Sequence, residues 1–368
     1  MTFNRRSFHR SLVAAAALCI VGSTAFATPE EGGMRAGKVF TSTNSAAGNE
    51  LLAYGSGPAG ALALLARYPT QGIGTSAGLG SQGAVQLSGD GRWLFVVNAG
   101  SNTVSTFAVR PVGLVLVSVH DSGGLHPISI SERDGLVYVL NDGGSGNVAG
   151  FRNDGGTLST VANSVRPLSA AGGTGPAQVS ISPDGDTLVV TEKTTSRIVS
   201  YALAADGSAG APLVTASAGI TPFGFAFDRR SRLIVSEANQ STLSTYRLNG
   251  STPVVISAAV STTQMAACWA AVTPNGRYAY TGNAGTSSIS LFAIDLQGRA
   301  TLVAGAAAST GSNGGAGDIA VAGHGRSLSI LAPRTPAIHS FTVAADGTLA
   351  PAASVTGLPT GVVGIAAN

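Results

Sequence analysis

The chain has 368 residues, of which 50 are glycine and only 11% are charged, against about 25% charged residues in an ordinary soluble domain. The first 27 residues hold three arginines and no acidic residue, so the rest of the chain carries 18 basic and 18 acidic side chains. This balance excludes the concentrated positive surface that nucleic-acid binding requires, and we expect no nucleic-acid partner.

The first 27 residues have the features of a secretory signal peptide. A basic start is followed by an apolar stretch and by the small-residue ending Ala25-Phe26-Ala27. Arg5-Arg6-Ser7-Phe8 also matches the twin-arginine pattern. We therefore expect removal of residues 1–27, a short N-terminal segment at 28–36, and a periplasmic or extracellular protein. Since no later apolar run reaches 18 residues, we expect no membrane contact after cleavage.

From residue 37 onward the sequence repeats a unit of four short apolar runs. The stretch 177–203 shows an alternating run, Pro-Asp-Gly, a second run, a polar loop and a third run, and a fourth run follows from Pro212. A two-residue turn with glycine between alternating runs is a strong hairpin signal. Equivalent turns recur at intervals of 44 to 50 residues, at Asp90-Gly91, Asp134-Gly135, Asp184-Gly185, Arg230-Ser231, Asn275-Gly276 and His324-Gly325.

A period in the forties with four strands per unit is typical of a β-propeller. The segment after residue 37 begins with the second strand of a unit, and the final residues GVVGIAAN supply the missing first strand. Six internal units and one shared unit predict an all-β, seven-bladed propeller over residues 37–368. Its four-stranded blades would be closed into a ring by the C-terminal strand, which leaves no long open sheet edge. We expect a monomer.

The repeat units resemble those of the seven-bladed lactonase-type propellers, a group that includes cyclising carboxymuconate enzymes and 6-phosphogluconolactonases. The resemblance is carried by VSISPDGDTLVVTE (179–192), GFAFDRRSRLIVSEA (224–238), AVTPNGRYAYTGN (271–283) and the DGTL turn at 346–349. It covers essentially all of 37–368 and implies a lactone hydrolase or cycloisomerase. Because propellers host many functions, it is stronger evidence for the fold than for the chemistry.

The chain departs from the pattern of the catalytic relatives at two blade openings. Those relatives usually carry Pro-His-x-His at one opening and Pro-Arg-His at the next. Here the openings read Pro176-Ala177-Gln178 and Pro222-Phe223-Gly224, so the histidines and the arginine of these patterns are absent. The acidic position at the end of the second strand is retained as Glu192 and Glu237. The chain is therefore most similar to a divergent, exported, lactonase-like branch.

Candidate site residues lie where the second strand of each blade ends, because in a blade this end and the start of the first strand surround one mouth of the central channel. Glu192 and Glu237 are the catalytic candidates here, since two carboxylates facing one cavity could share a proton. The alternative is that they replace asparagine in a solvated loop. The ligand-binding candidates at the equivalent positions are Asn44, Asn98, Asn141 and Asn283.

Four further residues complete the predicted mouth. His126 precedes Pro127, so we expect it to be extended and available as a general base, with a structural histidine as the alternative. Lys193 and Arg334 are candidate anion ligands, or else solvated loop cations. We align Cys268 with Gly83, His126, Ala177, Phe223 and Gly317, and interpret it as a small apolar residue, because no neighbour in sequence would lower the pKa of its thiol.

Two functions fit these observations. The first is an exported hydrolase or isomerase acting on a lactone or a related small organic or sugar acid. The second is a non-catalytic propeller that binds a sugar, peptide or protein partner on the same face. The expected ligand is a small or carbohydrate-like molecule.

The sequence contains no Cys/His cluster, calcium loop or phosphate loop, so we predict no metal and no cofactor. Asp228-Arg229-Arg230 is predicted to be a solvated turn on the opposite face.

Overall fold

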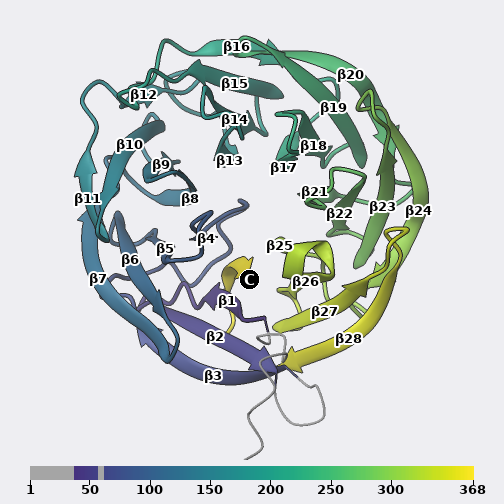
Figure 1. The fold of residues 1–368 in the computed structure, drawn as a ribbon, viewed down its shortest axis with the longest axis horizontal. Coiled ribbons are helices and arrows are strands. Elements are labelled where there is room, and N and C mark those ends of the chain that lie inside the picture. Colours follow the sequence, from purple (N-terminus) through teal and green to yellow (C-terminus); the bar gives the residue numbers. More distant parts are fainter. Residues whose placement is uncertain (1–36, 57–61) are drawn as a thin grey trace, which may run out of the picture. The chain divides into compact units, whose positions relative to one another are not determined.

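The computed structural model describes residues 37–56 and 62–368, and the predicted signal peptide and the segment 28–36 lie outside these described residues. The described chain forms seven antiparallel sheets arranged as blades around a central channel (Figure 1). This arrangement confirms the predicted all-β propeller, its seven blades and its closure by the C-terminal strand. No helix among the described residues is long and apolar enough to cross a membrane.

Each blade runs from an inner strand at the channel to an outer strand at the edge. The first blade contains β29 (Val363–Ala367), β1 (Val39–Ser42), β2 (Glu50–Ser56) and β3 (Leu62–Pro69). The second contains β4 (Val85–Leu87), β5 (Trp93–Asn98), β6 (Thr103–Arg110) and β7 (Gly113–Asp121). The third contains β8 (Pro127–Arg133), β9 (Leu136–Asn141), β10 (Asn147–Asp154) and an outer strand split into β11 (Thr157–Thr160) and β12 (Arg166–Pro167).

The remaining blades follow the same order from the channel outward. The fourth contains β13 (Pro176–Ile181), β14 (Thr187–Glu192), β15 (Arg197–Ala202) and β16 (Leu213–Ala216). The fifth contains β17 (Pro222–Phe227), β18 (Leu233–Glu237), β19 (Thr242–Asn249) and β20 (Thr252–Ser261). The sixth contains β21 (Ala267–Val272), β22 (Tyr278–Asn283), β23 (Ser288–Ile294) and β24 (Ala300–Ser309). The seventh contains β25 (Ile319–Ala322), β26 (Ser327–Ala332), β27 (Ala337–Val343) and β28 (Leu349–Thr356), with a short 3₁₀ turn at Gly323–Gly325.

The predicted hairpin turns join the first two strands of six blades. Their second residue has a positive φ in every case, which favours glycine. The single exception to glycine is Ser231, with φ of 55°. The φ values at the other five turns are between 69° and 86°, at Gly91, Gly135, Gly185, Gly276 and Gly325.

Ring closure depends on β29. This strand pairs antiparallel with β1, with Phe40 opposite Ala366 and Val39 opposite Ala367. The Thr41 hydroxyl adds a hydrogen bond to the Gly364 carbonyl at 2.7 Å. Val362 and Ile365 are buried in an apolar cluster with residues of the first and seventh blades. The two ends of the propeller are therefore held together by both backbone pairing and side-chain packing.

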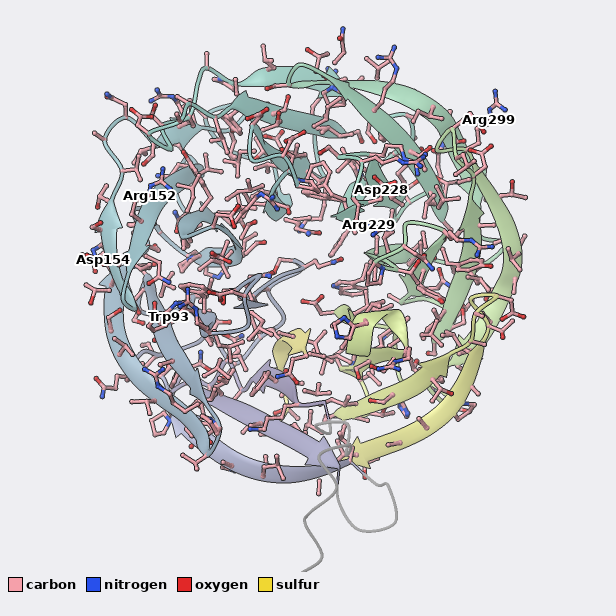
Figure 2. The ribbon with its side chains drawn as sticks, in the orientation of Figure 1. Trp93, Arg152, Asp154, Asp228, Arg229 and Arg299 are labelled. Atoms are coloured by element: carbon pink, nitrogen blue, oxygen red, sulfur yellow. The ribbon has the colours of Figure 1, made fainter. Side chains whose placement is uncertain are left out.

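The turn between β17 and β18 differs from the prediction. Arg229 and Arg230 are exposed, but Asp228 is only 3% exposed. Its Oδ2 lies 2.6 Å from the guanidinium of Arg232, and its Oδ1 accepts backbone hydrogen bonds within the turn. Asp228 is thus part of the packing of its blade and not a solvated residue (Figure 2).

Candidate functional site

Strand register confirms that the polar positions at the ends of the second strands are structurally equivalent. In four consecutive blades this residue pairs with the first residue of the inner strand, as Glu192 does with Pro176 and Glu237 with Pro222. We call the set the anchor ring, which consists of Asn44, Asn98, Asn141, Glu192, Glu237 and Asn283, with Ala332 in the seventh blade. All seven residues are 1% exposed or less.

The asparagines of the anchor ring hold nearby strands and connectors. The Asn44 amide nitrogen donates to the Ala77 carbonyl at 2.6 Å. Asn98 donates to the Ser105 hydroxyl at 2.8 Å and accepts from the Thr70 hydroxyl at 2.8 Å. Asn141 donates to the Ser122 carbonyl at 3.1 Å, and Asn283 to the Ser290 hydroxyl at 2.8 Å. These asparagines lie inside the protein and tie each blade together.

The two glutamates of the anchor ring hold their connectors by accepting hydrogen bonds alone. Glu192 accepts from the backbone N–H of Ser169 at 2.9 Å, from the Ser169 hydroxyl, and from the Thr195 hydroxyl at 2.6 Å. Glu237 accepts from the backbone N–H of Gly219 at 2.8 Å and the Thr242 hydroxyl at 2.5 Å. A carboxylate suits a position surrounded by donors, whereas an amide would present a donor of its own. Each carboxylate therefore has a structural role, and the catalytic role stays a prediction.

His126 lies near the mouth but is not extended. Its φ is 56°, in the left-handed region, and its backbone N–H donates to the Asn102 side chain at 2.7 Å. The register also corrects the alignment of His126 with Cys268. Because Pro127 pairs with Asn141 as Ala267 pairs with Asn283, the residue equivalent to Cys268 is Ile128. The alignment made from the sequence was therefore shifted by two residues at this opening, which contains Pro127.

The residues that line the mouth immediately follow the anchor ring in sequence. Ala238 and Ala284 pack against an apolar cluster that contains Phe223. Lys193 places its ammonium 5.1 Å from the centre of the Phe223 ring, a cation–π contact. Burial lowers the pKa of Lys193, while the negative charge of Asp142 opposes that shift. The mouth is therefore an apolar surface that carries a partly desolvated cation.

Cys268 belongs to the same apolar surface. It is 8% exposed and packs with Ala177 and Phe223. Burial raises the pKa of its thiol to about 12, and the charges of Lys193 and Arg334 only partly oppose this effect. Its thiol is consequently protonated at neutral pH, as expected for an unreactive buried cysteine. Both cations proposed from the sequence thus act electrostatically on one residue of the mouth.

The centre of the channel is crossed by a segment that the sequence pattern did not reveal. Residues 78–83, which we call the plug, precede β4 and extend into the ring (Figure 1). Lys193 donates to the Gly80 carbonyl at 2.5 Å, and the Trp269 indole to the Ser81 carbonyl at 3.0 Å. The Gln82 side chain pairs with both backbone groups of Ala270, at 2.8 and 3.0 Å. The plug is thus bonded across the channel as well as to its neighbours.

The plug also accounts for one departure from the catalytic relatives. Gly224 stands at the third position of the second blade opening, where those relatives carry histidine. A Cβ atom at Gly224 would lie 2.0 Å from Gln82 Oε1 and 2.8 Å from the Cys268 carbonyl oxygen. No side chain fits there while Gln82 holds its position. The plug therefore occupies space that a side chain at this opening would need.

Asp318 links the plug to the closing strand through hydrogen bonds. Among the described acidic residues at the channel, its pKa departs most from the ordinary value. It is 5% exposed, its Oδ2 accepts from the backbone N–H of Gly83 at 3.0 Å and its Oδ1 from that of Ile319 at 2.9 Å. Burial raises the pKa of Asp318 to about 7, although backbone N–H groups, including that of Ile365, oppose the shift. A carboxyl group that titrates near neutral pH inside a channel is a candidate acid or base.

Two cavities of about 320 Å³ lie on either side of the plug, and Asp318 lines both. The one at the mouth, which we call the mouth cavity, has a mainly apolar wall made of Gly78, Leu79, Gly80, Ser81, Trp269, Gly317, Asp318, Leu331, Pro333, Val362, Val363 and Gly364. The other lies deeper in the channel and includes Gln86 and Gln178. The sequence analysis did not single out Asp318, which lies immediately before β25.

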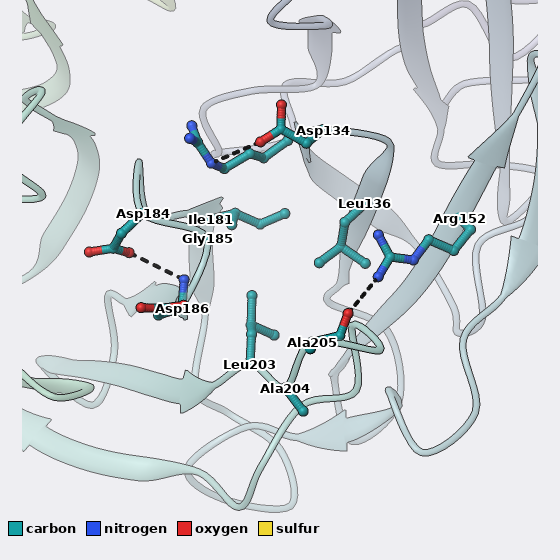
Figure 3. A pocket seen from close by; sticks show the side chains of 11 residues that line it. Asp134, Leu136, Arg152, Ile181, Asp184, Gly185, Asp186, Leu203, Ala204 and Ala205 are labelled. Carbon is teal, nitrogen blue, oxygen red and sulfur yellow. Dashed lines mark hydrogen bonds and ion pairs between the residues drawn. The ribbon is translucent and has the colours of Figure 1, made fainter.

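A third cavity, of about 250 Å³, lies at the hairpin turns of the third and fourth blades (Figure 3). Its charged groups bind one another or nearby backbone. Arg152 donates to the Ala205 carbonyl at 3.2 Å, and Arg133 lies 3.5 Å from Asp134. Within residues 37–56 and 62–368, no group of three or more His, Cys, Asp or Glu residues is placed to hold a metal ion.

Comparison with known proteins places this geometry in a family. The family model described as "Lactonase, 7-bladed beta-propeller" matches residues 49–166 and 145–266, which together exceed half of the chain. No curated protein matches in sequence.

Solved structures with the same fold include proposed 6-phosphogluconolactonases from Bacteroides fragilis and Bacteroides uniformis. Their identities are 19% and 18%, and their TM-scores 0.69 and 0.71. Each match covers 90% of this chain, and 98% and 99% of the respective relative. The periplasmic gluconolactonase of Pseudomonas aeruginosa is 16% identical with a TM-score of 0.68, and the match covers 90% of this chain and 98% of that one. The structural likeness supports the fold, and the family match identifies the chain as a member of the seven-bladed β-propeller lactonase family.

Proposed function

We propose that this protein is an exported enzyme that opens or isomerises a lactone, or a related small organic or sugar acid, at the channel mouth. The observation that carries the proposal is the family match together with the mouth cavity, which borders a buried carboxyl group of perturbed pKa. Functional sites are where such perturbed groups and concave surfaces coincide.

Lactone opening has three chemical requirements, and the mouth offers candidate groups for the base and for the cation. A base must activate water, and Asp318, Glu192, Glu237 and His126 are the candidates. Donors must stabilise the oxyanion that forms on the carbonyl oxygen. A cation must favour the carboxylate product, and we assign this task to the Lys193 and Arg334 side of the mouth. The asparagines of the anchor ring hold the connectors that carry these groups.

The experiment is a substrate panel on protein purified after expression of the full chain. Neutral lactones, sugar lactones and phosphorylated sugar lactones should be compared by pH-stat, with thermal shift recorded for every compound. We expect turnover of at least one lactone class above the uncatalysed rate. If every class were hydrolysed only at the background rate, the enzymatic function would be wrong.

A second function, ligand binding without catalysis, is favoured by one observation. Ala177 and Gly224 stand where the catalytic relatives carry histidines, and the plug is bonded to the Ala177 carbonyl and fills the space beside Gly224. A propeller of this kind would hold a sugar, peptide or protein partner on the same face. The same panel separates the two functions, because a binder would show thermal shifts without turnover.

Export is a separate part of the proposal. It rests on the Arg5-Arg6-Ser7-Phe8 and Ala25-Phe26-Ala27 motifs. Replacing Arg5 and Arg6 with lysine should abolish accumulation in the periplasm, measured by fractionation and immunoblotting. Mass spectrometry of the exported form should find Thr28 as the first residue. Undiminished export of the lysine variant would contradict the twin-arginine route.

A further inference from the structure

The mouth cavity has properties that a general lactone site does not require. Its wall is mainly apolar and includes Leu79, Leu331, Val362 and Val363. Asp318 is the single ionisable residue among those that line it. At about 320 Å³, the cavity lies at the small end of the range for ligand sites. A compact ligand with a largely apolar surface fits such a wall.

The charge of the cavity also selects among ligands. A carboxylate held there would repel a phosphate or a second carboxylate, and the low local dielectric strengthens that repulsion. Lys193 is not among the residues that line the cavity, and its ammonium is already bonded to the Gly80 carbonyl of the plug. An anionic sugar lactone is therefore a poor ligand for the cavity itself, whereas an uncharged lactone meets no such repulsion.

Asp318 retains the capacity to accept a proton. A carboxylate offers about four lone-pair positions, and three backbone N–H groups, those of Gly83, Ile319 and Ile365, bond to this one. These bonds come from the plug, from β25 and from β29, so they hold the carboxyl group in one orientation at the cavity wall. Fixed orientation with one free acceptor position is what a general base needs.

We infer that the mouth cavity binds an uncharged, alkyl-substituted lactone and that Asp318 is the base that activates water against it. This inference rests on the proposed function. The carboxylate takes a proton from water as the water oxygen bonds to the carbonyl carbon. The ring C–O bond then breaks, and the ring oxygen takes that proton back from Asp318. One lactone and one water give one hydroxy acid, which ionises in solvent and is drawn away from Asp318 toward Lys193 and Arg334.

The test compares Asp318→Asn with Asp154→Asn, a matched change at the exposed aspartate that ends β10 (Figure 2). Alkyl-substituted γ- and δ-lactones are the substrates, and gluconolactone and its 6-phosphate are the comparison set. We expect kcat/KM for alkyl lactones to exceed that for the phosphorylated lactone by about tenfold or more, and Asp318→Asn to lower kcat about 10²-fold. Asp154→Asn should leave kcat unchanged.

A second pair of variants tests the cavity without removing the carboxyl group. A Cβ atom at Gly78 or at Gly89 meets no atom within 4 Å, and neither glycine has a positive φ. Gly78 lines the mouth cavity, whereas Gly89 lies at a hairpin turn on the opposite face. Gly78→Trp should raise KM for alkyl lactones at least tenfold, and Gly89→Trp should not change it.

The outcomes separate the inference from the proposed function. Turnover that favours phosphorylated lactones, or full activity in folded Asp318→Asn, would overturn the inference and leave the lactonase function standing. If no lactone is turned over, titration with alkyl δ-lactams, which hydrolyse slowly, decides about the cavity. Binding to the wild type and to Gly89→Trp but not to Gly78→Trp would support an apolar ligand site in a non-enzyme. Equal binding to all three proteins, or binding to none, would overturn the site.

Discussion

The anchor ring and the plug are both polar structures around one channel, but they differ in how the sequence encodes them. The anchor ring repeats from blade to blade, and its asparagine and glutamate side chains are buried in hydrogen bonds to nearby strands and connectors. The plug occurs once. Its bonds run to residues as distant in sequence as Ala270 and Asp318.

This difference shows which irregularities in a repeat protein carry chemical information. Glu192 and Glu237 interrupt a set of asparagines, and the sequence alone makes them conspicuous. Their surroundings supply donors only, so a local packing requirement explains the substitution. Asp318 interrupts no pattern, but it lies where a unique segment crosses the channel.

Removing the closing strand should have the largest effect. Deletion of residues 362–368 removes β29 and exposes the partners of Val362 and Ile365, both of which are buried. Burial of two such side chains contributes about 3–6 kcal/mol, and the backbone pairing with β1 is lost as well. We expect the truncated chain to unfold or to aggregate, measured by circular dichroism and size exclusion. An unchanged Tm would contradict closure of the ring by β29.

Stability should depend on pH through Asp318. Burial raises the pKa of this carboxyl group from 3.8 to about 7, so folding favours its protonated form. The stabilisation that protonated Asp318 gives to the folded state is fully present below pH 4 and is lost as pH rises through 7. A shift of this size corresponds to about 4 kcal/mol in the free energy of unfolding. Urea unfolding at pH 4, 5.5, 7 and 8 should show a decline that Asp318→Asn reduces, and parallel curves for the two proteins would refute this.

Changing a carboxylate of the anchor ring should cost stability more than turnover. Glu237→Gln places an amide donor opposite the donors Gly219 N–H and Thr242 hydroxyl, which should lower the free energy of unfolding by about 1–3 kcal/mol. If Glu237 is only an anchor, kcat of the folded variant stays within about twofold. A loss of 10²-fold or more would establish the catalytic role predicted from the sequence.

Loosening the plug should have a smaller effect. Gln82→Ala removes both hydrogen bonds to the backbone of Ala270 and should cost about 1–2 kcal/mol. Hydrogen exchange of residues 78–83 should accelerate, while exchange in the outer strands stays as in the wild type. Exchange that accelerates equally throughout the ring would show that Gln82 supports the whole fold and not the plug.

The smallest effect is expected at the cysteine. Burial keeps the Cys268 thiol protonated at neutral pH, since its pKa is raised to about 12. Cys268→Ser should retain wild-type turnover and cost about 1 kcal/mol for the buried hydroxyl. Slow reaction of the native protein with a thiol reagent, relative to the unfolded chain, should accompany this result. Fast labelling of the native thiol would contradict it.

Much of the fold could be predicted because its determinants are local. The alternation of apolar and polar residues, the turn glycines and the period in the forties each depend on residues close together in sequence, and they predicted the blades, the closing strand and the equivalence of Glu192 with Glu237. The site was harder. The sequence placed Lys193 and Arg334 at the mouth, but it could not tell that the anchor ring points into the protein, because a buried anchor and a solvated loop residue share the same polar character.

Short-range patterns of hydropathy and turn chemistry are enough to predict the seven-bladed ring and its family, because hairpins and strand pairing follow from them. What fills the channel depends on contacts that form only in the folded protein. Gln82 forms a hydrogen bond to Ala270 across the channel. Asp318 accepts one from Gly83, which is 235 residues away in sequence. Contacts of this kind leave no periodic trace in a sequence, because each depends on one pair of residues that closure of the ring brings together. Asp318 is buried where the plug contacts the closing strand, and this burial raises its pKa toward neutral pH. Residues 317–319 alone would not produce the shift.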